Sequence, residues 1–306
     1  MLARIYRCDA GIRLMNTLKV RQSNQIAKPK LRRRLLRWLV IITSPYVLFC
    51  AGCATFQRKL IYFPPVFDRA TADQLGVSQN LQPWNNGSGD TIGWKRSVQA
   101  RPARGQILVL HGNAGAAVQC ARYADVIQQA VPFDVFIVEY PGYADRPGAP
   151  SEHTLEESAD AAFQTLATNG PVYLVGESLG TGVACWLAGK HPDRIAGVIL
   201  LAPYNTLTDV AQEHMPLLPV HLLLVDRFRS EKYLSDYSGP IAVLVGGGDQ
   251  VVPEKFGRRL YDDYAGPKRL WEFPKGDHGT VMEQPPEIWK QIINFLQANP
   301  HLAKRN

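Results

Sequence analysis

Three side chains of this sequence could together carry out nucleophilic catalysis: Ser178, Asp249 and His278. A serine hydroxyl is a weak nucleophile until a neighbouring base accepts its proton. Histidine titrates near neutral pH, so an imidazole can take that proton and later return it to the leaving group. A carboxylate beside the imidazole holds the required tautomer and stabilises the protonated ring. The chain order Ser, Asp, His is the order expected when these residues follow successive strands of a parallel sheet.

Ser178 lies in a Gly-x-Ser-x-Gly pattern between a predicted strand, residues 172–175, and a predicted helix. This is the nucleophile-elbow pattern, in which a tight turn raises the serine clear of the sheet. Gly176 and Gly180 are needed because side chains there would collide where the strand and the helix nearly touch. The turn also puts the backbone N–H of Leu179 at a helix N-terminus, where it can bind a developing oxyanion.

Asp249 and His278 each follow a predicted strand, at residues 241–245 and 269–273. Functional groups of an open parallel sheet gather beyond the carboxyl ends of its strands, so we expect both side chains to approach Ser178. Asp277 is an alternative acid. As the sequence neighbour of His278 it is poorly placed to face Nδ1 of that ring, and the sequence therefore favours Asp249.

A glycine-containing loop, residues 111–115, follows another predicted strand. Glycines let a backbone approach a ligand closely. The backbone N–H of Asn113, or alternatively that of Ala114, is therefore the predicted second oxyanion donor beside Leu179. We interpret His111 as a structural histidine that orients this loop.

Near-continuous apolar strands alternate with amphipathic helices along most of the chain. This alternation predicts an α/β fold, with a mostly parallel central sheet and helices on both of its faces. Trp94 and its neighbours are expected in antiparallel strands at the start of the sheet. The predicted strands cover residues 106–110, 134–140, 172–175, 197–201, 241–245 and 269–273, and the clearest predicted helices cover residues 117–130, 152–169 and 287–297.

The sheet pattern breaks at about residues 203–238, around a strongly apolar run at 217–225. An insertion at this place predicts a small lid over the site. Alternatively, the same pattern indicates a helix packed on the domain. The insertion is too short to be a large cap domain, so we expect an open site that suits bulky or surface-presented substrates.

The positive charge of the chain is concentrated in its first segment. Residues 1–52 carry eleven basic side chains and one acid, whereas residues 53–306 carry 23 basic and 26 acidic side chains, a net charge of −3. A nucleic-acid-binding protein would show a basic surface on its folded domain. The charge distribution therefore predicts no nucleic-acid partner.

Residues 1–53 have the pattern of a leader, and residues 54–306 form the predicted catalytic domain. A basic segment, residues 28–37, precedes an uncharged apolar run of 19 residues, 38–56, as in a secretory signal. The end of this run resembles a bacterial lipobox, which makes Cys53 a candidate for lipidation. An uncleaved signal anchor, with Pro45 inside it, is the alternative, and an organellar presequence is a third. The first two predict a membrane-anchored, extracytoplasmic, periplasm-facing domain.

Neither the cysteines nor the histidines show the spacing of a metal site. Cys120 falls on the apolar stripe of a predicted helix, so it is interpreted as a buried thiol. The sequence predicts no metal and no cofactor.

From about Ile61 to Leu296 the chain resembles the alpha/beta-hydrolase family, and most closely its membrane-associated single-domain branch, which includes protein depalmitoylases and assorted esterases. The resemblance implies a serine-hydrolase triad of Ser178, Asp249 and His278. The chain departs from the branch at residues 143–147, where a glycine- and serine-rich continuation is usual, so substrate preference is not carried over. The matching segments are residues 111–114, 140–143, 176–180, 249–253 and 276–278.

These patterns together predict a membrane-tethered serine hydrolase that cleaves carboxylic esters or thioesters through an acyl-enzyme. We expect a small-molecule or lipid-like acyl substrate and a monomeric protein. An acyltransferase or a peptidase could use the same three residues, and would differ in passing the acyl group to an alcohol or in cleaving amides. A catalytically silent envelope scaffold is the non-enzymatic alternative, which turnover of any simple ester would exclude.

Overall fold

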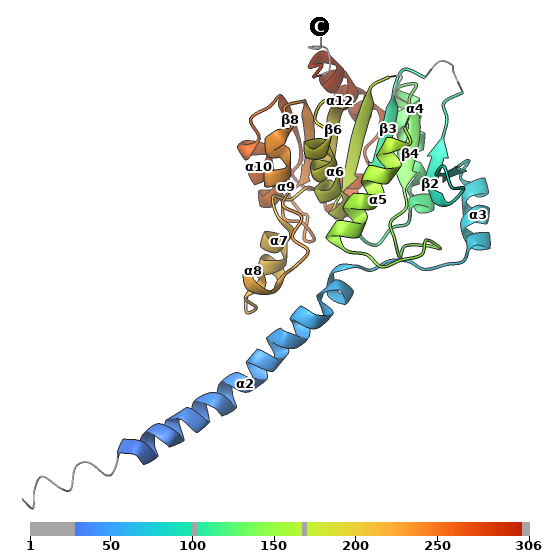
Figure 1. Ribbon diagram of the computed structural model, residues 1–306. Helices are drawn as coiled ribbons and strands as arrows, with labels where there is room; N and C mark the ends of the chain where they lie inside the picture. The colour runs from blue at the N-terminus through green and yellow to red at the C-terminus, as the bar shows by residue number, and fades with distance from the viewer. Residues whose placement is uncertain (1–27, 100–102, 167–169, 302–306) are drawn as a thin grey trace, which may run out of the picture. The chain divides into compact units, whose positions relative to one another are not determined.

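The computed structural model describes residues 28–99, 103–166 and 170–301 (Figure 1). The chain divides into two compact units, Met1–Thr55 and Phe56–Asn306. Helix α2, Lys28–Ile61, makes up the described part of the first unit, and its last residues belong to the second. Residues 1–27, the first part of the predicted leader, lie outside the described residues.

Helix α2 contains a segment, Leu31–Ile61, that is long and apolar enough to cross a membrane. A helix of about 20 apolar residues spans the hydrocarbon core of a bilayer. Pro45 lies inside α2 and does not end it. The predicted apolar run is therefore one continuous helix that carries Cys53.

The second unit is built on a sheet of eight strands in the order β1-β2-β4-β3-β5-β6-β7-β8. Neighbouring strands from β4 to β8 in this order are parallel, whereas β2 is antiparallel to both β1 and β4. The predicted mostly parallel sheet is confirmed, and Trp94 lies in the antiparallel β2 as expected. The strands are β1 Gln82–Asn85, β2 Thr91–Arg96, β3 Gln106–Leu110, β4 Asp134–Val138, β5 Val172–Glu177, β6 Ile195–Leu201, β7 Ile241–Gly246 and β8 Lys268–Phe273.

Helices cover both faces of this sheet, as predicted. Successive strand residues point to opposite faces, so β3 sends Leu108 and Leu110 into one apolar cluster and Ile107 and Val109 into the other. All four side chains are fully buried. The first cluster packs under α5 Glu152–Gln164, α6 Leu179–Lys190 and α10 Glu254–Asp263, and the second under α3 Arg69–Ser78, η1 Ala117–Cys120, α4 Ala121–Ala130 and α12 Pro286–Ala298.

Helices α5 and α10 differ from the expectation. The helix predicted at residues 152–169 begins as expected, because the Ser151 side chain accepts a hydrogen bond from the Thr154 N–H and caps it, but it ends at Gln164. Residues 167–169 lie outside the described residues. Helix α10 was not predicted, because only Phe256 and Leu260 form its apolar stripe among many charged residues.

The insertion predicted as a lid, about residues 203–238, folds as short helices rather than as one packed helix. They are α7 Leu207–His214, α8 Val220–Leu223, α9 Ser230–Tyr233 and η2 Leu234–Asp236. Within its apolar run, Leu218 and Leu224 are buried, whereas Leu217 is 85% exposed and Leu222 is 82% exposed. The run therefore contributes to the core only in part and also presents large apolar side chains to the surroundings.

Candidate active site

Ser178, His278 and Asp249 form one hydrogen-bonded row at the carboxyl edge of the sheet. The Ser178 Oγ lies 3.1 Å from His278 Nε2, and His278 Nδ1 lies 2.7 Å from Asp249 Oδ2. The other carboxylate oxygen, Oδ1, accepts hydrogen bonds from the backbone N–H groups of Val251 and Val252, both at 2.8 Å. An ionised carboxylate only accepts, so Nδ1 carries the proton and Nε2 is left to accept the proton of the serine.

The backbone around Ser178 has the strained geometry of a nucleophile elbow. Ser178 has φ 51° and ψ −114°, a left-handed conformation that residues with side chains rarely adopt. A Cβ on Gly180 would lie 2.0 Å from the Leu110 carbonyl oxygen, and a Cβ on Gly176 would lie 2.7 Å from Thr181 Cα. Gly176 is thus required for the reason that the sequence predicted, whereas Gly180 is required because α6 begins close against the end of β3.

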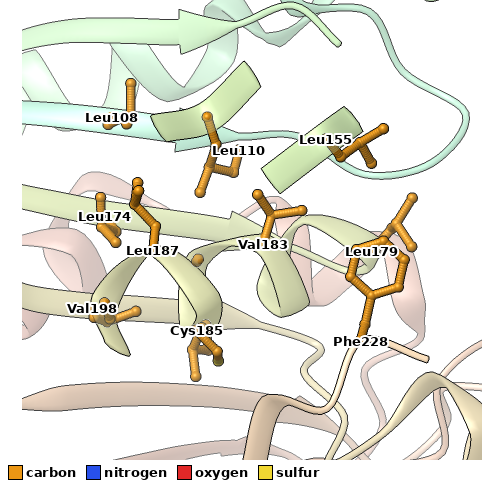
Figure 2. Close-up of a cluster of buried hydrophobic side chains, with 14 of the residues drawn as sticks. Leu108, Leu110, Leu155, Leu174, Leu179, Val183, Cys185, Leu187, Val198 and Phe228 are labelled. Atoms are coloured by element: carbon orange, nitrogen blue, oxygen red, sulfur yellow. The ribbon is translucent and has the colours of Figure 1, made fainter. Parts of the chain in front are cut away.

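Apolar packing holds this elbow in place. Leu179 and Val183, on the first turns of α6, are buried together with Leu155 of α5 and Phe228 of the lid (Figure 2). The Phe228 side chain lies against Gly182, where a Cβ would meet it at 2.8 Å. The insertion of residues 203–238, the predicted lid, therefore shares one core with the elbow, and both position Ser178.

Asp277, the alternative acid, has a different role. Its Oδ1 accepts hydrogen bonds from the N–H of Thr280 at 2.8 Å and from the hydroxyl of the same residue at 2.7 Å. These bonds cap helix α11, His278–Met282, and they hold the pKa of Asp277 below its usual value. His278 is consequently the first residue of a short helix, whereas the sequence analysis placed it in a loop.

The predicted oxyanion donors, Leu179 and Asn113, lie on the elements expected. Leu179 is the first residue of α6, so its N–H has no acceptor within the helix. The Asn113 side chain bonds to other parts of the chain. Its Oδ1 accepts hydrogen bonds from the Phe63 N–H at 3.1 Å and from the Tyr143 hydroxyl at 3.0 Å. Its Nδ2 donates a hydrogen bond to the Ile61 carbonyl. These bonds tie the loop to the chain that follows α2. The role of the two N–H groups remains a prediction.

His111 is fully buried beneath this loop, in keeping with a structural role. Its Nδ1 lies 2.8 Å from the Gly112 carbonyl oxygen. Its Nε2 lies 3.3 Å from Glu139 Oε1, close but without hydrogen-bond geometry. Glu139 Oε2 accepts a hydrogen bond from the Ala117 N–H at 3.0 Å. The imidazole therefore orients the loop from below, and Glu139 is a partner that the sequence analysis missed.

Glu177, the residue before Ser178, is a second group that was missed. Its Oε2 accepts hydrogen bonds from Arg122 Nη2 at 2.6 Å and from the Tyr123 hydroxyl at 2.5 Å. Burial raises the pKa of Tyr123 well above its usual value, so the phenol remains a neutral donor. Contacts across more than 50 residues leave no local pattern in a sequence, which explains the omission.

The sequence predicts a buried thiol for Cys120 and lipidation for Cys53, and the structure shows where both residues lie. Cys120 is buried as expected, and desolvation raises the pKa of its thiol, which suppresses reactivity. Cys53 is half-buried within α2. Its lipidation remains a prediction.

Comparison with known proteins identifies relatives of this chain. A family model described as the alpha/beta hydrolase fold matches residues 105–230. An uncharacterized protein of Mycobacterium tuberculosis is 32% identical over 247 residues, which cover 78% of this chain and 87% of that protein. The lysophosphatidylserine lipase ABHD12 of Danio rerio is 29% identical over 328 residues, covering 88% of this chain and 85% of the relative. An uncharacterized membrane protein of Saccharomyces cerevisiae is 32% identical over 199 residues, covering 62% and 70%.

Solved structures show the same fold. The esterase Est1E from Butyrivibrio proteoclasticus, in its complex with ferulic acid, superposes with a TM-score of 0.59 and covers 70% of this chain and 98% of its own. The two sequences are 16% identical, so this similarity concerns the fold alone.

Proposed function

Because this chain belongs to the alpha/beta-hydrolase fold family, we propose that it is a membrane-tethered serine hydrolase that cleaves carboxylic esters or thioesters through an acyl-enzyme. The observation that carries the proposal is the row from Ser178 Oγ through His278 to Asp249, with separations of 3.1 and 2.7 Å. Both distances are within the hydrogen-bond reach that proton transfer requires.

In the proposed acylation step, His278 Nε2 takes the proton of Ser178 while the serine Oγ attacks the carbonyl carbon of the substrate. The carbonyl oxygen becomes an oxyanion, which the N–H groups of Leu179 and Asn113 would bind. The protonated ring then gives its proton to the departing alcohol or thiol as the bond to the carbonyl carbon breaks. Asp249 stabilises the imidazolium throughout, because its carboxylate is already oriented by two backbone N–H groups.

In the proposed deacylation step, a water molecule replaces the leaving group. His278 accepts a proton from this water, whose oxygen attacks the acyl carbon and displaces Ser178 Oγ. The same ring returns the proton to the serine, so the enzyme is regenerated and a carboxylic acid is released.

A lipid-like ester is the substrate class that we favour. One relative of near full-length coverage is a lysophosphatidylserine lipase, which supports an acyl ester of a phospholipid type. Leu217, which is 85% exposed in the insertion of residues 203–238, also suits a substrate with an acyl chain. The resemblance to thioester-cleaving proteins keeps acyl thioesters within the proposal.

We propose that α2 anchors the chain in a membrane with the catalytic unit on the extracytoplasmic side. The apolar segment Leu31–Ile61 and the yeast relative described as a membrane protein support anchoring, and the basic residues before the segment support the orientation. The intact mass of the membrane-bound protein distinguishes the two anchors. Loss of residues 1–52 with a lipid adduct on Cys53 indicates a lipoprotein, and an unprocessed chain indicates a signal anchor.

The proposed chemistry is tested with Ser178→Ala and, as a matched control, Ser78→Ala, which removes an exposed hydroxyl on α3. We expect Ser178→Ala to abolish labelling by a fluorophosphonate and to lower kcat for esters and thioesters by at least about 10³-fold. The control should behave as wild type. Persistent labelling of Ser178→Ala would refute the proposal, and acyl transfer to an added alcohol in preference to water would indicate an acyltransferase instead.

A further inference from the structure

A cavity of about 520 Å³ lies beside the lid, where the end of α8 and the start of α9 approach the start of α5. Three of its lining residues are cations, Arg227, Arg229 and Lys232, and one is an acid, Glu152. The mechanism proposed above uses none of these four side chains. The lining therefore carries a net positive charge that requires an explanation.

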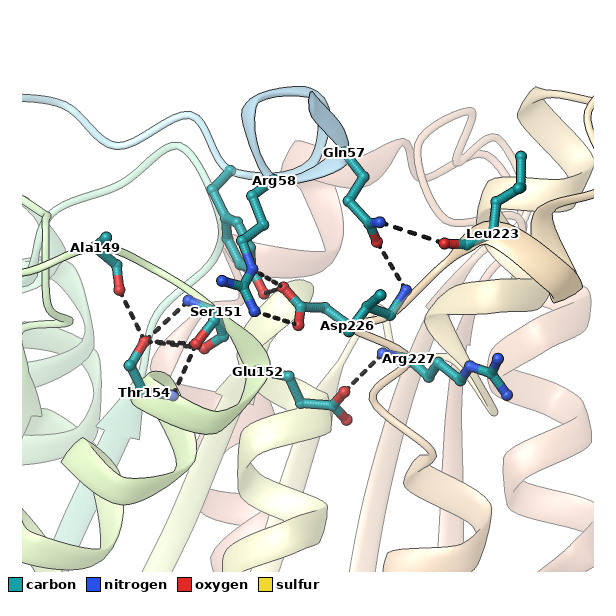
Figure 3. A network of polar contacts seen from close by, with 11 residues as sticks. Gln57, Arg58, Ala149, Ser151, Glu152, Thr154, Leu223, Asp226 and Arg227 are labelled. Carbon is teal, nitrogen blue, oxygen red and sulfur yellow. Dashed lines mark hydrogen bonds and ion pairs between the residues drawn. The ribbon is translucent and has the colours of Figure 1, made fainter. Parts of the chain in front are cut away.

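Glu152 does not balance this charge, because its carboxylate is already occupied. Oε1 accepts hydrogen bonds from the Phe228 N–H at 2.6 Å and from the Tyr233 hydroxyl at 2.7 Å. Oε2 accepts one from the Arg227 N–H at 2.7 Å (Figure 3). These bonds fasten the chain after α8 to the N-terminus of α5.

The three cations differ in how many hydrogen bonds and ion pairs they make within the protein. The Arg227 side chain donates hydrogen bonds to the carbonyl oxygens of Leu224 and His221, so it is partly used in holding the lid together. Arg229 and Lys232 are exposed, and within the described part of the chain no ion pair is recorded for either of them. Two cations are thus available at the cavity for an anionic ligand.

The lining of the cavity also includes exposed apolar side chains. Leu222, which is 82% exposed, and Val225, which is 64% exposed, belong to its lining. Large apolar side chains that gather on a surface beside cations mark a place where a protein meets a partner or a membrane. A cationic side next to an apolar rim matches the boundary between lipid headgroups and acyl chains.

The rim is fastened to the end of the helix that could cross a membrane. Gln57 Oε1 accepts a hydrogen bond from the Val225 N–H at 2.7 Å, and Gln57 Nε2 donates to the Leu223 carbonyl at 3.3 Å (Figure 3). Gln57 belongs to the same compact unit as the cavity and lies in the last turns of α2. If α2 spans a bilayer, chain connectivity alone keeps the rim within reach of its surface.

The cavity also lies at the edge of the sheet that carries Ser178. Helix α5 begins after the carboxyl end of β4, and Ser178 follows the carboxyl end of β5, which is parallel to β4 through β3. Carboxyl ends of parallel strands share one edge of a sheet. A membrane lipid bound in the cavity would therefore orient the carboxyl edge of the sheet, which carries Ser178, toward the membrane.

We propose that this cavity binds the phosphate group of an anionic phospholipid, with Arg229 and Lys232 contacting the phosphate while Leu222 and Val225 insert between acyl chains. The inference rests on the membrane anchoring proposed above. Lys and Arg attract the negative charge of the headgroup, and exposed Leu222 and Val225 can contact acyl chains, which a soluble anion does not have. The lipid in the cavity is a docking ligand rather than the substrate.

The test uses the full-length protein in detergent, mixed with equal amounts of phosphatidylglycerol and phosphatidylcholine, repurified, and analysed by mass spectrometry for retained lipid. We expect the wild type to retain the anionic lipid over the zwitterionic one by about tenfold. The double variant Arg229→Gln/Lys232→Gln should retain both lipids equally. The control Arg104→Gln/Lys290→Gln, which removes two exposed cations outside the cavity, should retain the wild-type preference.

A second pair of variants tests the apolar rim. Leu222→Ser/Val225→Ser should lower the retention of both lipids, whereas Val77→Ser, which changes an apolar residue on α3 that is 79% exposed, should not. Equal retention of the two lipids by the wild type, or an unchanged preference in Arg229→Gln/Lys232→Gln, would overturn the proposal. So would complete displacement of phosphatidylglycerol by inorganic phosphate, because the site would then suit a soluble anion.

Turnover of p-nitrophenyl acetate is measured on the same samples and should be equal in the wild type and in all of these variants. This readout separates the two proposals. A wild type that retains anionic lipid without esterase turnover would contradict the proposed function alone, and turnover without lipid preference would contradict the cavity assignment alone.

Discussion

Two buried aspartates, Asp249 and Asp226, show how differently the same side chain can be held. The Asp249 carboxylate accepts hydrogen bonds from two backbone N–H groups of the residues that follow it, and its other oxygen contacts His278 Nδ1. The Asp226 carboxylate accepts side-chain hydrogen bonds from Arg58, with Nε at 3.1 Å, and from the Tyr62 hydroxyl at 3.0 Å (Figure 3). The partners of the first are local, and those of the second lie more than 160 residues away in the chain.

The difference corresponds to two functions. A carboxylate oriented by its own loop keeps its geometry independently of distant segments, as a partner of a reactive imidazole must. A carboxylate bound by distant side chains joins the segments that carry them, here the end of α2 and the lid. Burial and the Asp226 charge raise the pKa of Tyr62, so its hydroxyl remains a neutral donor to this junction.

The largest effect is expected from the local aspartate. Asp249→Asn should lower kcat for ester hydrolysis by about 10³–10⁴-fold, because an amide can donate to Nδ1 and so favours the wrong tautomer of His278. Asp277→Asn is the matched control, since asparagine caps a helix as well as aspartate and Asp277 does not face Nδ1. Steady-state kinetics on p-nitrophenyl esters measure both. Equal losses in the two variants would contradict the separation of their roles.

The distant aspartate should instead affect stability. Arg58→Ala removes two N–H donors from the buried Asp226 carboxylate, which we expect to lower the free energy of unfolding by about 1–3 kcal/mol. Lys255→Ala, which breaks an exposed pair with Glu213, should cost less than about 0.5–1 kcal/mol. Chemical denaturation of the two variants measures the difference. Wild-type stability of Arg58→Ala would show that the junction does not hold the lid.

A third buried carboxylate, Glu156 on α5, sharpens the comparison because desolvation outweighs the donors that it has. Among the described residues no hydrogen-bond partner is recorded for its Oε1, and Glu152 and Asp226 lie near it. Desolvation, followed by the charge of Glu152, raises its pKa from 4.5 to about 8, although a hydrogen bond with Tyr233 and the charge of Lys190 oppose the shift. The folded protein therefore binds a proton that the unfolded chain releases, and stability falls as the pH rises from 4.5 to about 8.

Glu156→Gln removes this dependence. The melting temperature of the variant should exceed that of the wild type by about 2–4 °C at pH 8 and by much less at pH 5. The exposed neighbour Glu157 provides the control Glu157→Gln, whose difference from the wild type should not change with pH in this way. Differential scanning calorimetry across this pH range measures both variants. A gain that is larger at pH 5 than at pH 8 would reverse the assigned sign.

The elements that carry the site could be predicted because their signals are local. Strands β3, β5 and β7 are short apolar runs, and the elbow is recognised from five consecutive residues, although the close neighbour of Gly180 is the distant Leu110 carbonyl. The position of Asp249 after β7 also follows from the chain. Helix α11 was missed because a helix of five residues has too few turns to show a periodic pattern.

The alternation of strands and helices, the elbow, and the candidates Ser178, Asp249 and His278 could all be predicted from the chain, because each is signalled by neighbours within a few residues. Only the tertiary structure decided which distant groups meet. Arg122 with Glu177, His111 with Glu139 and Arg58 with Asp226 were brought together by packing. The members of each pair lie far apart in the chain and become neighbours only when the strands and the insertion pack together. The spacing of residues along the sequence therefore does not predict these contacts.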